Sequence, residues 1–277
     1  YVALGIKSRA CLAEGDWDGA FKAAKRVIDE GGYAVGTKSD LTGGMNSLDK
    51  QNVMWGAGIQ VADQAGGYAG FFTHMDNKEG AYAKSAPKLI SKQLYNRISA
   101  TDIRRDWWDP SDKESPYVSK KFSFANVASF LGDYIYMRVE EMYFTAAEAA
   151  LRLDDLKSAR ELMNTVMAER DPGYSANNRS GTLLGATTTT WTGSFLENIL
   201  THRRIELWGE YGRLFDVRRL GQGIDRRTDD GFSEECISMM NRRNVNITKA
   251  DTYDWVLTIP KAELDANPNI NEEDQNP

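Results

Sequence analysis

The sequence predicts a mostly helical protein in which similar helix pairs are separated by a long, loop-rich insertion with short strands. Three observations support this fold class. Apolar residues recur at helical spacing within residues 1–33 and again within 135–173. Each region carries an aspartate at the break between its two helices, and the stretch between the regions is rich in glycine and aromatic residues. No apolar run reaches the ~18–20 residues that a membrane-spanning helix needs.

The first helix pair is expected within residues 1–33. Gly15-Asp16 interrupts its apolar pattern, and the Asp16 carboxylate can accept hydrogen bonds from the first free amides of the second helix. Gly31-Gly32 is a typical helix end. The face that we expect this second helix to bury carries Trp17, Ala20, Ala24, Val27 and Ile28.

A second pair is expected within residues 135–173, with Asp154-Asp155 at the break and Pro172-Gly173 at the end. In both pairs an alanine stands four residues after the turn aspartate, and such small residues let helices approach closely, as in tetratricopeptide repeats. The two pairs are not in tandem, so a plain solenoid does not fit, and two unrelated helical hairpins are the alternative. The stripe of the first helix is Ile135, Val139, Met142, Ala146, Ala149 and Leu153.

Further elements are expected around these pairs. Ser194 and Glu197 fit a capping box, which predicts a helix running toward Gly209. Within residues 34–132, the stretch 51–59 predicts a strand, Lys120 to Phe122 predicts the start of a short strand, and the glycine- and aromatic-rich stretch 65–72 predicts an irregular loop.

Composition excludes several classes of function. The net charge is −6 and the sequence pI is about 5.2, whereas a domain that binds nucleic acid normally shows a basic face and a high pI. Cys11 and Cys236 are far apart, and His74 and His202 are isolated, so the pattern favours neither a zinc site nor a disulfide framework. We expect two free thiols, with a bridge between them as the alternative, and neither a metal nor a cofactor.

The acidic residues are interpreted as scaffold. We expect ion pairs on adjacent helical turns between Arg138 and Glu141, and between Arg203 and both Glu206 and Glu210. No carboxylate pair stands out as the two acids that glycoside hydrolysis needs.

Two further acidic features are interpreted in the same way. Glu148 is expected to reach a neighbouring helix end or an arginine such as Arg213. Residues 109–114 offer oxygens that suit calcium but lack the ligand register of an EF-hand, so a solvated acidic turn is favoured.

Four segments together resemble the SusD/RagB family. Residues 133–149 (DYIYMRVEEMYFTAAEA) are similar to its Arg-x-x-Glu helix with a closing Ala-Glu-Ala, and 203–220 (RRIELWGEYGRLFDVRRL) to its stretch of alternating acids and arginines. The other two are the Ile259-Pro260, Asn267-Pro268 and Gln275-Asn276-Pro277 signature, and Gly15-Asp16-Trp17 with Gly32-Tyr33. Two departures are His202, where the family usually has Glu, and Tyr211, inserted before Gly212.

The resemblance implies a SusD-like fold and a non-enzymatic surface lipoprotein of the outer membrane. Such a protein binds an oligosaccharide or similar nutrient and delivers it to a SusC-like TonB-dependent transporter. The resemblance covers the family's C-terminal portion. The N-terminal portion, whose lipidated cysteine anchors the protein to the membrane, has no counterpart in the sequence, and Tyr1 stands directly inside an expected helix.

We expect three parts: a helix pair (1–36), a loop-rich ligand-binding insertion (37–132) and a C-terminal helical part with the family signature (133–277). Aromatic rings stack on the C–H faces of sugars and give large contact areas at low entropic cost. The ligand is therefore expected on the insertion, with Trp107, Trp108, Tyr68, Phe71, Phe72, Tyr82 and Trp55 as candidates.

Alternatives to this interpretation stay open. Trp55 and one of the adjacent Trp107 and Trp108 could belong to the core, and the aromatic residues among the glycines could anchor a loop. A protein-interaction module of tetratricopeptide type without a small ligand is the rival function. A glycoside-active enzyme is the third.

Overall fold

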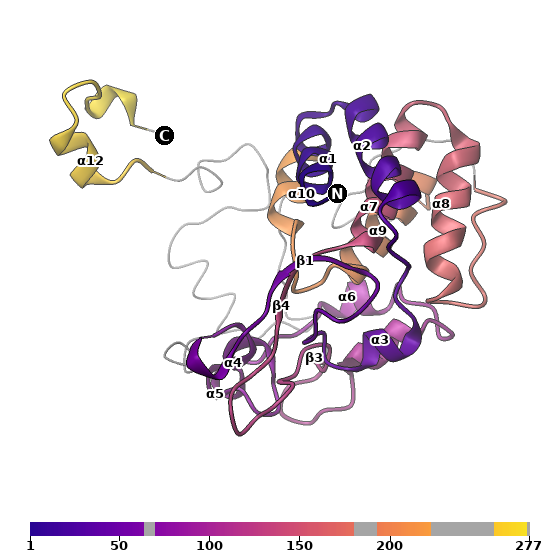
Figure 1. The fold of residues 1–277 in the computed structure, drawn as a ribbon, viewed down its shortest axis with the longest axis horizontal. Helices are drawn as coiled ribbons and strands as arrows, with labels where there is room; N and C mark the ends of the chain where they lie inside the picture. Colours follow the sequence, from indigo (N-terminus) through magenta and orange to yellow (C-terminus); the bar gives the residue numbers. More distant parts are fainter. Residues whose placement is uncertain (64–69, 180–192, 223–257, 276–277) are drawn as a thin grey trace.

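The computed structural model describes residues 1–63, 70–179, 193–222 and 258–275. Its longer helices gather on one side of the molecule, and the short helices and strands of the insertion lie on the other (Figure 1). The helical side comprises α1 (Val2–Glu14), α2 (Trp17–Glu30), α7 (Val139–Arg152), α8 (Leu156–Ala168), α9 (Phe195–Glu206) and α10 (Arg213–Arg219). The predicted mostly helical fold is confirmed.

Both predicted helix pairs are present, and local hydrogen bonds explain their boundaries. Asp16 accepts a hydrogen bond from the amide of Gly19 (2.9 Å) at the start of α2, and Asp155 accepts one from Ser158 (3.0 Å) at the start of α8. Gly15 ends α1 in the left-handed conformation, with a φ of 86°. Each pair is thus defined by its own turn.

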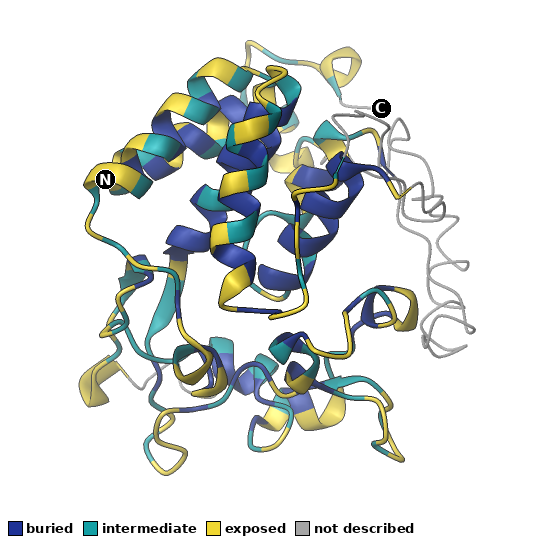
Figure 2. Cartoon of the chain, turned by 90° about the vertical axis from the view of Figure 1, so that its right-hand side faces the viewer, coloured by how far each residue is buried: buried dark blue, intermediate teal, exposed yellow. Residues whose placement is uncertain are grey.

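The helix α7 lies at the centre of the helical side and packs against α1, α2, α8 and α9. Its alanines are fully buried, which lets the neighbouring helices approach closely. Figure 2 shows buried residues where the helices face one another and exposed residues on their outer faces. Because α7 is covered on several sides, its stripe of small residues forms the centre of the first hydrophobic core.

A two-stranded antiparallel sheet connects the halves of the chain. The strand β1 (Val53–Ala57) lies within the predicted stretch 51–59 and pairs with β4 (Tyr134–Arg138), placing Gly56 opposite Ile135. Ile135 was expected on the helical stripe, but it lies on β4, and α7 begins only at Val139. Apolar residues of a strand and of the helix that follows it can mimic one helical stripe, which explains the error.

The insertion contains short elements around a second core. They are α3 (Lys38–Thr42), α4 (Phe71–Met75), α5 (Ala81–Ser85), α6 (Lys92–Tyr95), the 3₁₀ helix η2 (Ile103–Trp107), and the strand pair β2 (Trp108–Asp109) and β3 (Val118–Ser119). The strand expected to start at Lys120 ends at Ser119 instead. Ile205 of α9 belongs to this second core, so the insertion packs on the helical side.

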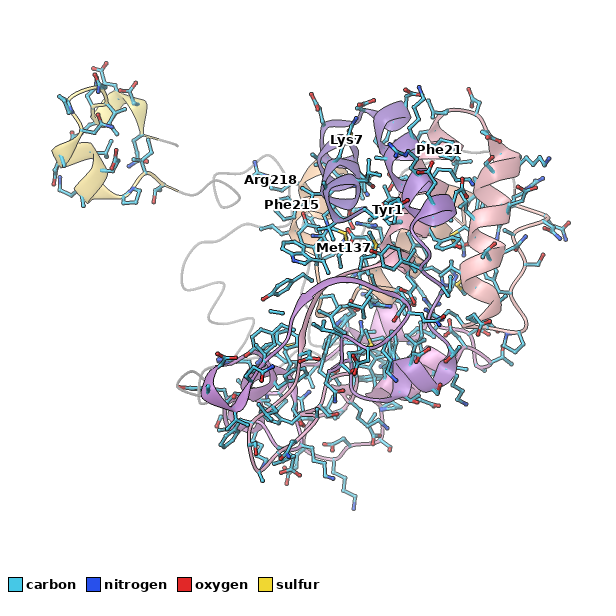
Figure 3. The ribbon with its side chains drawn as sticks, viewed as in Figure 1. Tyr1, Lys7, Phe21, Met137, Phe215 and Arg218 are labelled. Carbon is cyan, nitrogen blue, oxygen red and sulfur yellow. The ribbon has the colours of Figure 1, made fainter. Side chains whose placement is uncertain are left out.

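The first helix rests on the sheet. Met137 of β4 lies beneath α1 (Figure 3), and a Cβ atom on Gly5 would overlap its thioether sulfur. Gly5 therefore sets how closely α1 approaches β4.

The C-terminal segment 258–275 lies apart from the helical side in Figure 1. It contains α12 (Lys261–Ala266) and the 3₁₀ helix η5 (Glu272–Asp274), and none of its residues is buried. The Gln275 side chain accepts a hydrogen bond from the amide of Ile259 (2.7 Å) and donates one to its carbonyl (3.0 Å), which closes the segment on itself. Within the ranges that the structure describes, no helix has the length and apolar character to cross a bilayer.

Candidate functional site

An aromatic cavity of about 410 Å³ lies beside the β1–β4 sheet, within the roughly 300–1,000 Å³ range of ligand pockets. Trp55 and Tyr136 line it and are each 41% exposed, so they mark its mouth. Their rings meet edge to face, with centroids 5.2 Å apart. The complete lining is Arg9, Met45, Trp55, Phe71, Phe122, Tyr134, Ile135, Tyr136, Gly209, Glu210 and Tyr211.

All three expected parts of the chain contribute to this cavity. Arg9 comes from the first helix pair, Trp55 and Phe71 from the insertion, and Tyr136 and Tyr211 from the C-terminal part. The arrangement therefore exists only when distant segments have packed together.

Gly209 is required by the cavity wall. Its φ is +74°, a conformation that residues with a side chain rarely adopt. A Cβ atom there would also stand 2.6 Å from Cε2 of Phe122 and 2.8 Å from Cε of Met75. Since Phe122 lines the cavity, a side chain at Gly209 would displace the wall.

Two charged residues border the cavity, and both are engaged elsewhere. Glu210 accepts hydrogen bonds from Lys121 Nζ (2.5 Å) and from Arg138 Nη2 (2.7 Å) and Nε (2.8 Å). Burial would raise the pKa of Glu210, but the positive charges of Arg138 and Lys121 outweigh it and lower the pKa below its ordinary value. Arg9 forms a two-point ion pair with Glu141 and lies 3.7 Å above the Tyr211 ring.

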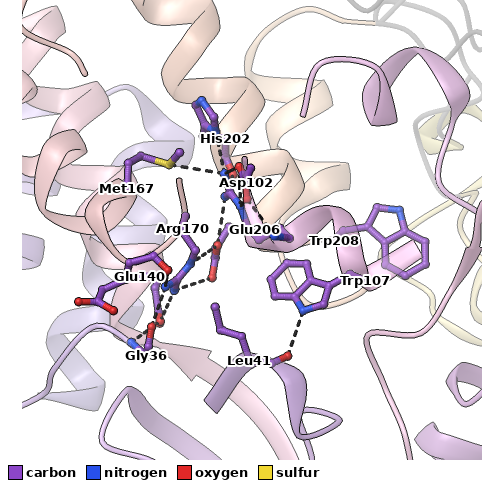
Figure 4. A network of polar contacts seen from close by, with 12 residues as sticks. Gly36, Leu41, Asp102, Trp107, Glu140, Met167, Arg170, His202, Glu206 and Trp208 are labelled. Atoms are coloured by element: carbon purple, nitrogen blue, oxygen red, sulfur yellow. Dashed lines mark hydrogen bonds and ion pairs between the residues drawn. The ribbon is translucent and has the colours of Figure 1, made fainter. Parts of the chain in front are cut away.

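Behind the cavity lies a buried cluster of charges centred on Glu206 (Figure 4). Arg138 Nη1 donates to Glu206 Oε1 at 3.0 Å, Arg170 Nε to Oε2 at 3.0 Å, and Arg104 Nη1 to Oε2 at 3.1 Å. None of these four side chains is exposed. Burial would raise the pKa of Glu206, but the three guanidinium groups outweigh it and hold the pKa well below its ordinary value.

The cluster extends to further elements. Arg170 also donates to Glu140 (2.8 Å) and to the carbonyl of Gly36 (2.6 Å), and Arg104 lies 2.8 Å from Nδ1 of His202. Burial and the charge of Arg104 lower the pKa of His202 well below its ordinary value, so the ring is neutral. A neutral imidazole can accept a hydrogen bond from Arg104, which suits this position.

The arginines of the predicted ion pairs bind other carboxylates than the ones expected on adjacent helical turns. Arg138 pairs with Glu140, Glu206 and Glu210 rather than with Glu141, since it precedes α7 and reaches α9. Arg203 pairs with Glu141 and Asp216.

Glu148 reaches an arginine at the end of a neighbouring helix, as expected, and this arginine is Arg219. Glu148 binds Arg219 of α10 (2.7 Å) and Arg152 (2.9 Å), not Arg213. The acidic residues therefore form ion pairs, as the scaffold interpretation expects. Arg152 lies one turn away on the same helix, whereas Arg219 comes from another element.

Comparison with known proteins identifies this scaffold. The SusD family model (SusD_RagB) matches residues 109–277. The chain belongs to the SusD family.

Solved structures of SusD-like proteins share this fold. A SusD-like carbohydrate binding protein from Bacteroides vulgatus is 28% identical, with a TM-score of 0.66 over 82% of this chain and 46% of its own. A SusD superfamily protein from Bacteroides thetaiotaomicron is 22% identical, with a TM-score of 0.74 over 99% of this chain and 60% of its own. The surface glycan-binding protein A from Bacteroides uniformis is 17% identical, with a TM-score of 0.65 over the same shares.

The chain spans 46 to 60% of the length of these relatives. No curated protein matches it. The likenesses at 22% and 17% identity show the fold alone.

The structure brings two of the predicted ligand-binding residues to the cavity of this SusD family member, Trp55 and Phe71. Tyr82 is partly buried and stacks on His74 with centroids 4.5 Å apart, and it does not line the cavity. Tyr68 lies outside the described residues.

The remaining three candidates are core residues. Trp107 is 3% exposed. Its indole donates a hydrogen bond to the carbonyl of Leu41 (3.0 Å), and Lys121 Nζ lies over its ring, 4.5 Å from the centroid. Trp108 is 1% exposed and packs edge to face on Trp208. Phe72 is 2% exposed. Stacking of a sugar needs an accessible ring face, which these three buried rings do not offer.

The sequence interpretation missed most of the cavity. Tyr134 and Tyr136 alternate with Ile135 on one strand. This alternation is a strand pattern, but Ile135 was assigned to the apolar stripe of the following helix instead. Tyr211, noted as a departure from the family pattern, is part of the lining. No sequence pattern around Arg9 indicates that it lines the cavity, because its partners Tyr136 and Glu141 are more than 120 residues away.

The described residues hold no group of three or more His, Cys, Asp or Glu side chains placed to bind a metal ion. In the acidic turn 109–114, Asp109 accepts hydrogen bonds from Ser111, and Asp112 accepts them from the amides of Glu114 and Ser115. These oxygens stabilise the turn itself. Cys11 is a buried free thiol, and Cys236 lies outside the described residues.

A second, more polar cavity of about 380 Å³ lies between Lys38, Arg105 and the acidic turn. Trp108 borders it but is almost completely buried. Of these two cavities, the first has half-exposed aromatic rings in its lining, which makes it the better candidate for a ligand.

Proposed function

We propose that this SusD family member binds an oligosaccharide at the outer cell surface without chemically changing it, and that the aromatic cavity is its binding site. The observation that carries the proposal is the half-exposed pair of Trp55 and Tyr136 at the mouth of a cavity of about 410 Å³. Exposed rings beside a hollow suit the flat C–H face of a sugar. Two proteins of similar structure, a SusD-like carbohydrate binding protein and a surface glycan-binding protein, support the ligand class.

The rest of the proposed role follows the family. The whole protein is proposed to be a lipoprotein of the outer membrane that delivers its ligand to a SusC-like TonB-dependent transporter. Residues 1–36 and 133–277 are proposed as scaffold and 37–132 as the main ligand-binding insertion, with Arg9, Tyr136 and Tyr211 as scaffold contributions to the site. Absence of catalysis is supported by the engagement of Glu206 and Glu210 in arginine and lysine contacts, which leaves them unsuited as a general acid.

The experiment is a calorimetric screen of the purified chain against a panel of oligosaccharides, followed by Trp55→Ala on every hit. We expect loss of binding with an unchanged melting temperature, because Trp55 is half exposed. Phe130→Ala is the matched control: this ring is 50% exposed and does not line the cavity. Binding that survives Trp55→Ala would move the site elsewhere, and new reducing ends after incubation would contradict the absence of catalysis.

Delivery to a transporter needs its own measurement. Co-purification of the full-length protein with a TonB-dependent transporter from outer membranes is expected. Recovery from the cytoplasm would contradict the proposed location. Binding of a protein partner through the Trp55 face, with no glycan hit, would favour the rival protein-interaction module.

A further inference from the structure

We infer that the cavity receives an apolar substituent of a sugar, such as an acyl or aryl group, while the sugar ring itself stays at the mouth. This inference rests on the proposed function, since it names which part of the bound glycan enters the cavity. Its basis is the state of the polar atoms in the lining.

The carboxylate of Glu210 already accepts hydrogen bonds from two buried cations. Lys121 and Arg138 place three hydrogen bonds of 2.5 to 2.8 Å on its two oxygens. Lys121 in turn donates to the carbonyls of Glu206 (2.7 Å) and Trp208 (2.9 Å), which fixes its position. The charge of this carboxylate is thus compensated within the protein, and a sugar hydroxyl would find at most one further acceptor position, on Oε2.

The guanidinium of Arg9 is engaged in a similar way. Its Nε and Nη2 donate to the Glu141 carboxylate at 2.8 and 2.7 Å, and Nη2 also donates to the carbonyl of Tyr136 at 2.6 Å. One face of the guanidinium is covered by Tyr211. Only Nη1 has no hydrogen bond to a described residue, so Arg9 offers a ligand few donors.

The rest of the lining is mainly apolar, apart from the Tyr134 hydroxyl, which accepts a hydrogen bond from the amide of Phe71 (3.3 Å). Met45 and Phe122 are buried, and Phe71 and Ile135 are partly buried. A hydroxyl-rich ring placed among these groups would lose its hydrogen bonds to water without replacement, which disfavours binding. An acyl or aryl group has a large apolar surface and at most one or two acceptors, so it matches this environment.

The mouth has the opposite character. The hydroxyl groups of Tyr136 and Tyr211 form no hydrogen bond with any described residue, and the Trp55 ring is 41% exposed. The exposed Trp55 ring can stack on a sugar ring, and the two tyrosine hydroxyl groups can bind its hydroxyls while water satisfies the rest. The division into an apolar interior and a polar, aromatic mouth points to an amphiphilic glycan unit.

The test compares phenyl β-D-glucopyranoside with methyl β-D-glucopyranoside, which share one sugar and differ in the apolar group. Saturation-transfer NMR on the wild-type chain is expected to show the strongest transfer to the phenyl protons, and calorimetry to show at least about tenfold tighter binding of the phenyl glycoside. Equal binding, strongest transfer to the sugar protons, or binding of neither compound would overturn the inference.

A variant pair locates the effect. Ile135→Trp fills the cavity from β4 and is expected to abolish the preference for the phenyl compound, whereas Ile135→Val is expected to keep it. If the larger side chain prevents folding, the NMR contrast on the wild-type chain still decides. If a folded Ile135→Trp protein still prefers the phenyl glycoside, the phenyl group does not bind in this cavity and the inference is overturned.

A last comparison separates the inference from the proposed function. Acetylated xylo-oligosaccharides and the same preparation after alkaline deacetylation are titrated against the wild-type and Trp55→Ala chains. Trp55-dependent binding of the acetylated form alone supports both ideas. Equal, Trp55-dependent binding of both forms keeps the proposed function and overturns the inference.

Discussion

Arg138, the last residue of β4, donates from Nη1 to Glu206, the last residue of α9, at 3.0 Å, and neither side chain is exposed. The same guanidinium binds Glu210, which borders the aromatic cavity. One side chain therefore joins the sheet, the helical core and the candidate site. A buried arginine with several carboxylate partners is tolerated because each charge is compensated.

Removal of this arginine is expected to destabilise the protein severely. Arg138→Met leaves the carboxylates of Glu206 and Glu210 short of positive charge in a buried site, and loss of one partner of a buried ion pair costs about 3–5 kcal/mol. Urea unfolding at pH 7 measures the change in the free energy of unfolding. Arg26→Met, which breaks the exposed Arg26–Glu30 pair of α2, is the matched control and is expected to have a small effect. Equal losses in both variants would show that the cluster contributes nothing special.

Enlarging the centre of α7 is expected to destabilise the fold. Ala146 is fully buried in the first core, and overpacking of a well-packed core typically costs about 1–3 kcal/mol. Ala146→Leu should therefore lower the melting temperature. Ala13→Leu, the same change at an exposed position of α1, is the control. An unchanged melt for Ala146→Leu would mean that the helices can separate without cost.

Gly209→Ala is expected to affect both stability and the cavity. A non-glycine residue in the left-handed region costs about 1–3 kcal/mol, and here the added Cβ would also push Phe122 toward the cavity. Gly32→Ala isolates the backbone effect, because Gly32 has a φ of +72° and open space around it. Urea unfolding should show a larger loss for Gly209→Ala, and calorimetry should show weaker binding of any ligand found. An identical loss of unfolding free energy in both variants would show that Phe122 can move away from the added Cβ without cost.

Stability is expected to rise with pH between about pH 8 and 9.5 because of Lys121. Burial lowers the pKa of Lys121 to about 8, against the opposing charge of Glu210, whereas a lysine of the unfolded chain has a pKa of about 10.4. Between these two values the unfolded chain binds more protons, so raising the pH favours the folded state. Below pH 8 both states are protonated, and the contribution of Lys121 stays constant at its least favourable value.

Urea unfolding at pH 7, 8, 9 and 9.5 measures this slope. Lys121→Met should flatten it. Lys120→Met, a neighbouring change at an exposed side chain, should leave it intact. A slope that is the same in all three proteins would contradict the role given to Lys121. The range stops at 9.5 because tyrosines of the unfolded chain ionise near pH 10.

The helix pairs could be predicted because their determinants are local. Asp16 and Asp155 each lie three residues before the amide that they bind, so spacing in the sequence is sufficient. Ser194 likewise accepts from the amide of Glu197 at the predicted start of α9. Short-range hydrogen bonds leave a pattern in the sequence that can be recognised without knowledge of the fold.

The site could be predicted only in part, because its determinants are distant. Arg138 and Glu206 are 68 residues apart, and Arg9 and Glu141 are 132 apart. Trp107 and Trp55 have the same side chain, yet one is buried under Lys121 and the other is half exposed. Composition alone cannot distinguish these two environments, since the difference lies in which segments pack above each ring.

Glu210 stands both in the wall of the cavity and in the hydrogen-bonded cluster with Lys121 and Arg138. The Glu210 side chain is therefore preorganised: its position in the wall is already restricted before any ligand arrives. Side chains that must be immobilised on binding cost about 0.5–1.5 kcal/mol each, and a side chain already held in place avoids part of that cost. Conversely, a side chain held in this way cannot move aside, so at Glu210 selectivity would come from exclusion of groups that do not fit as much as from attraction of those that do.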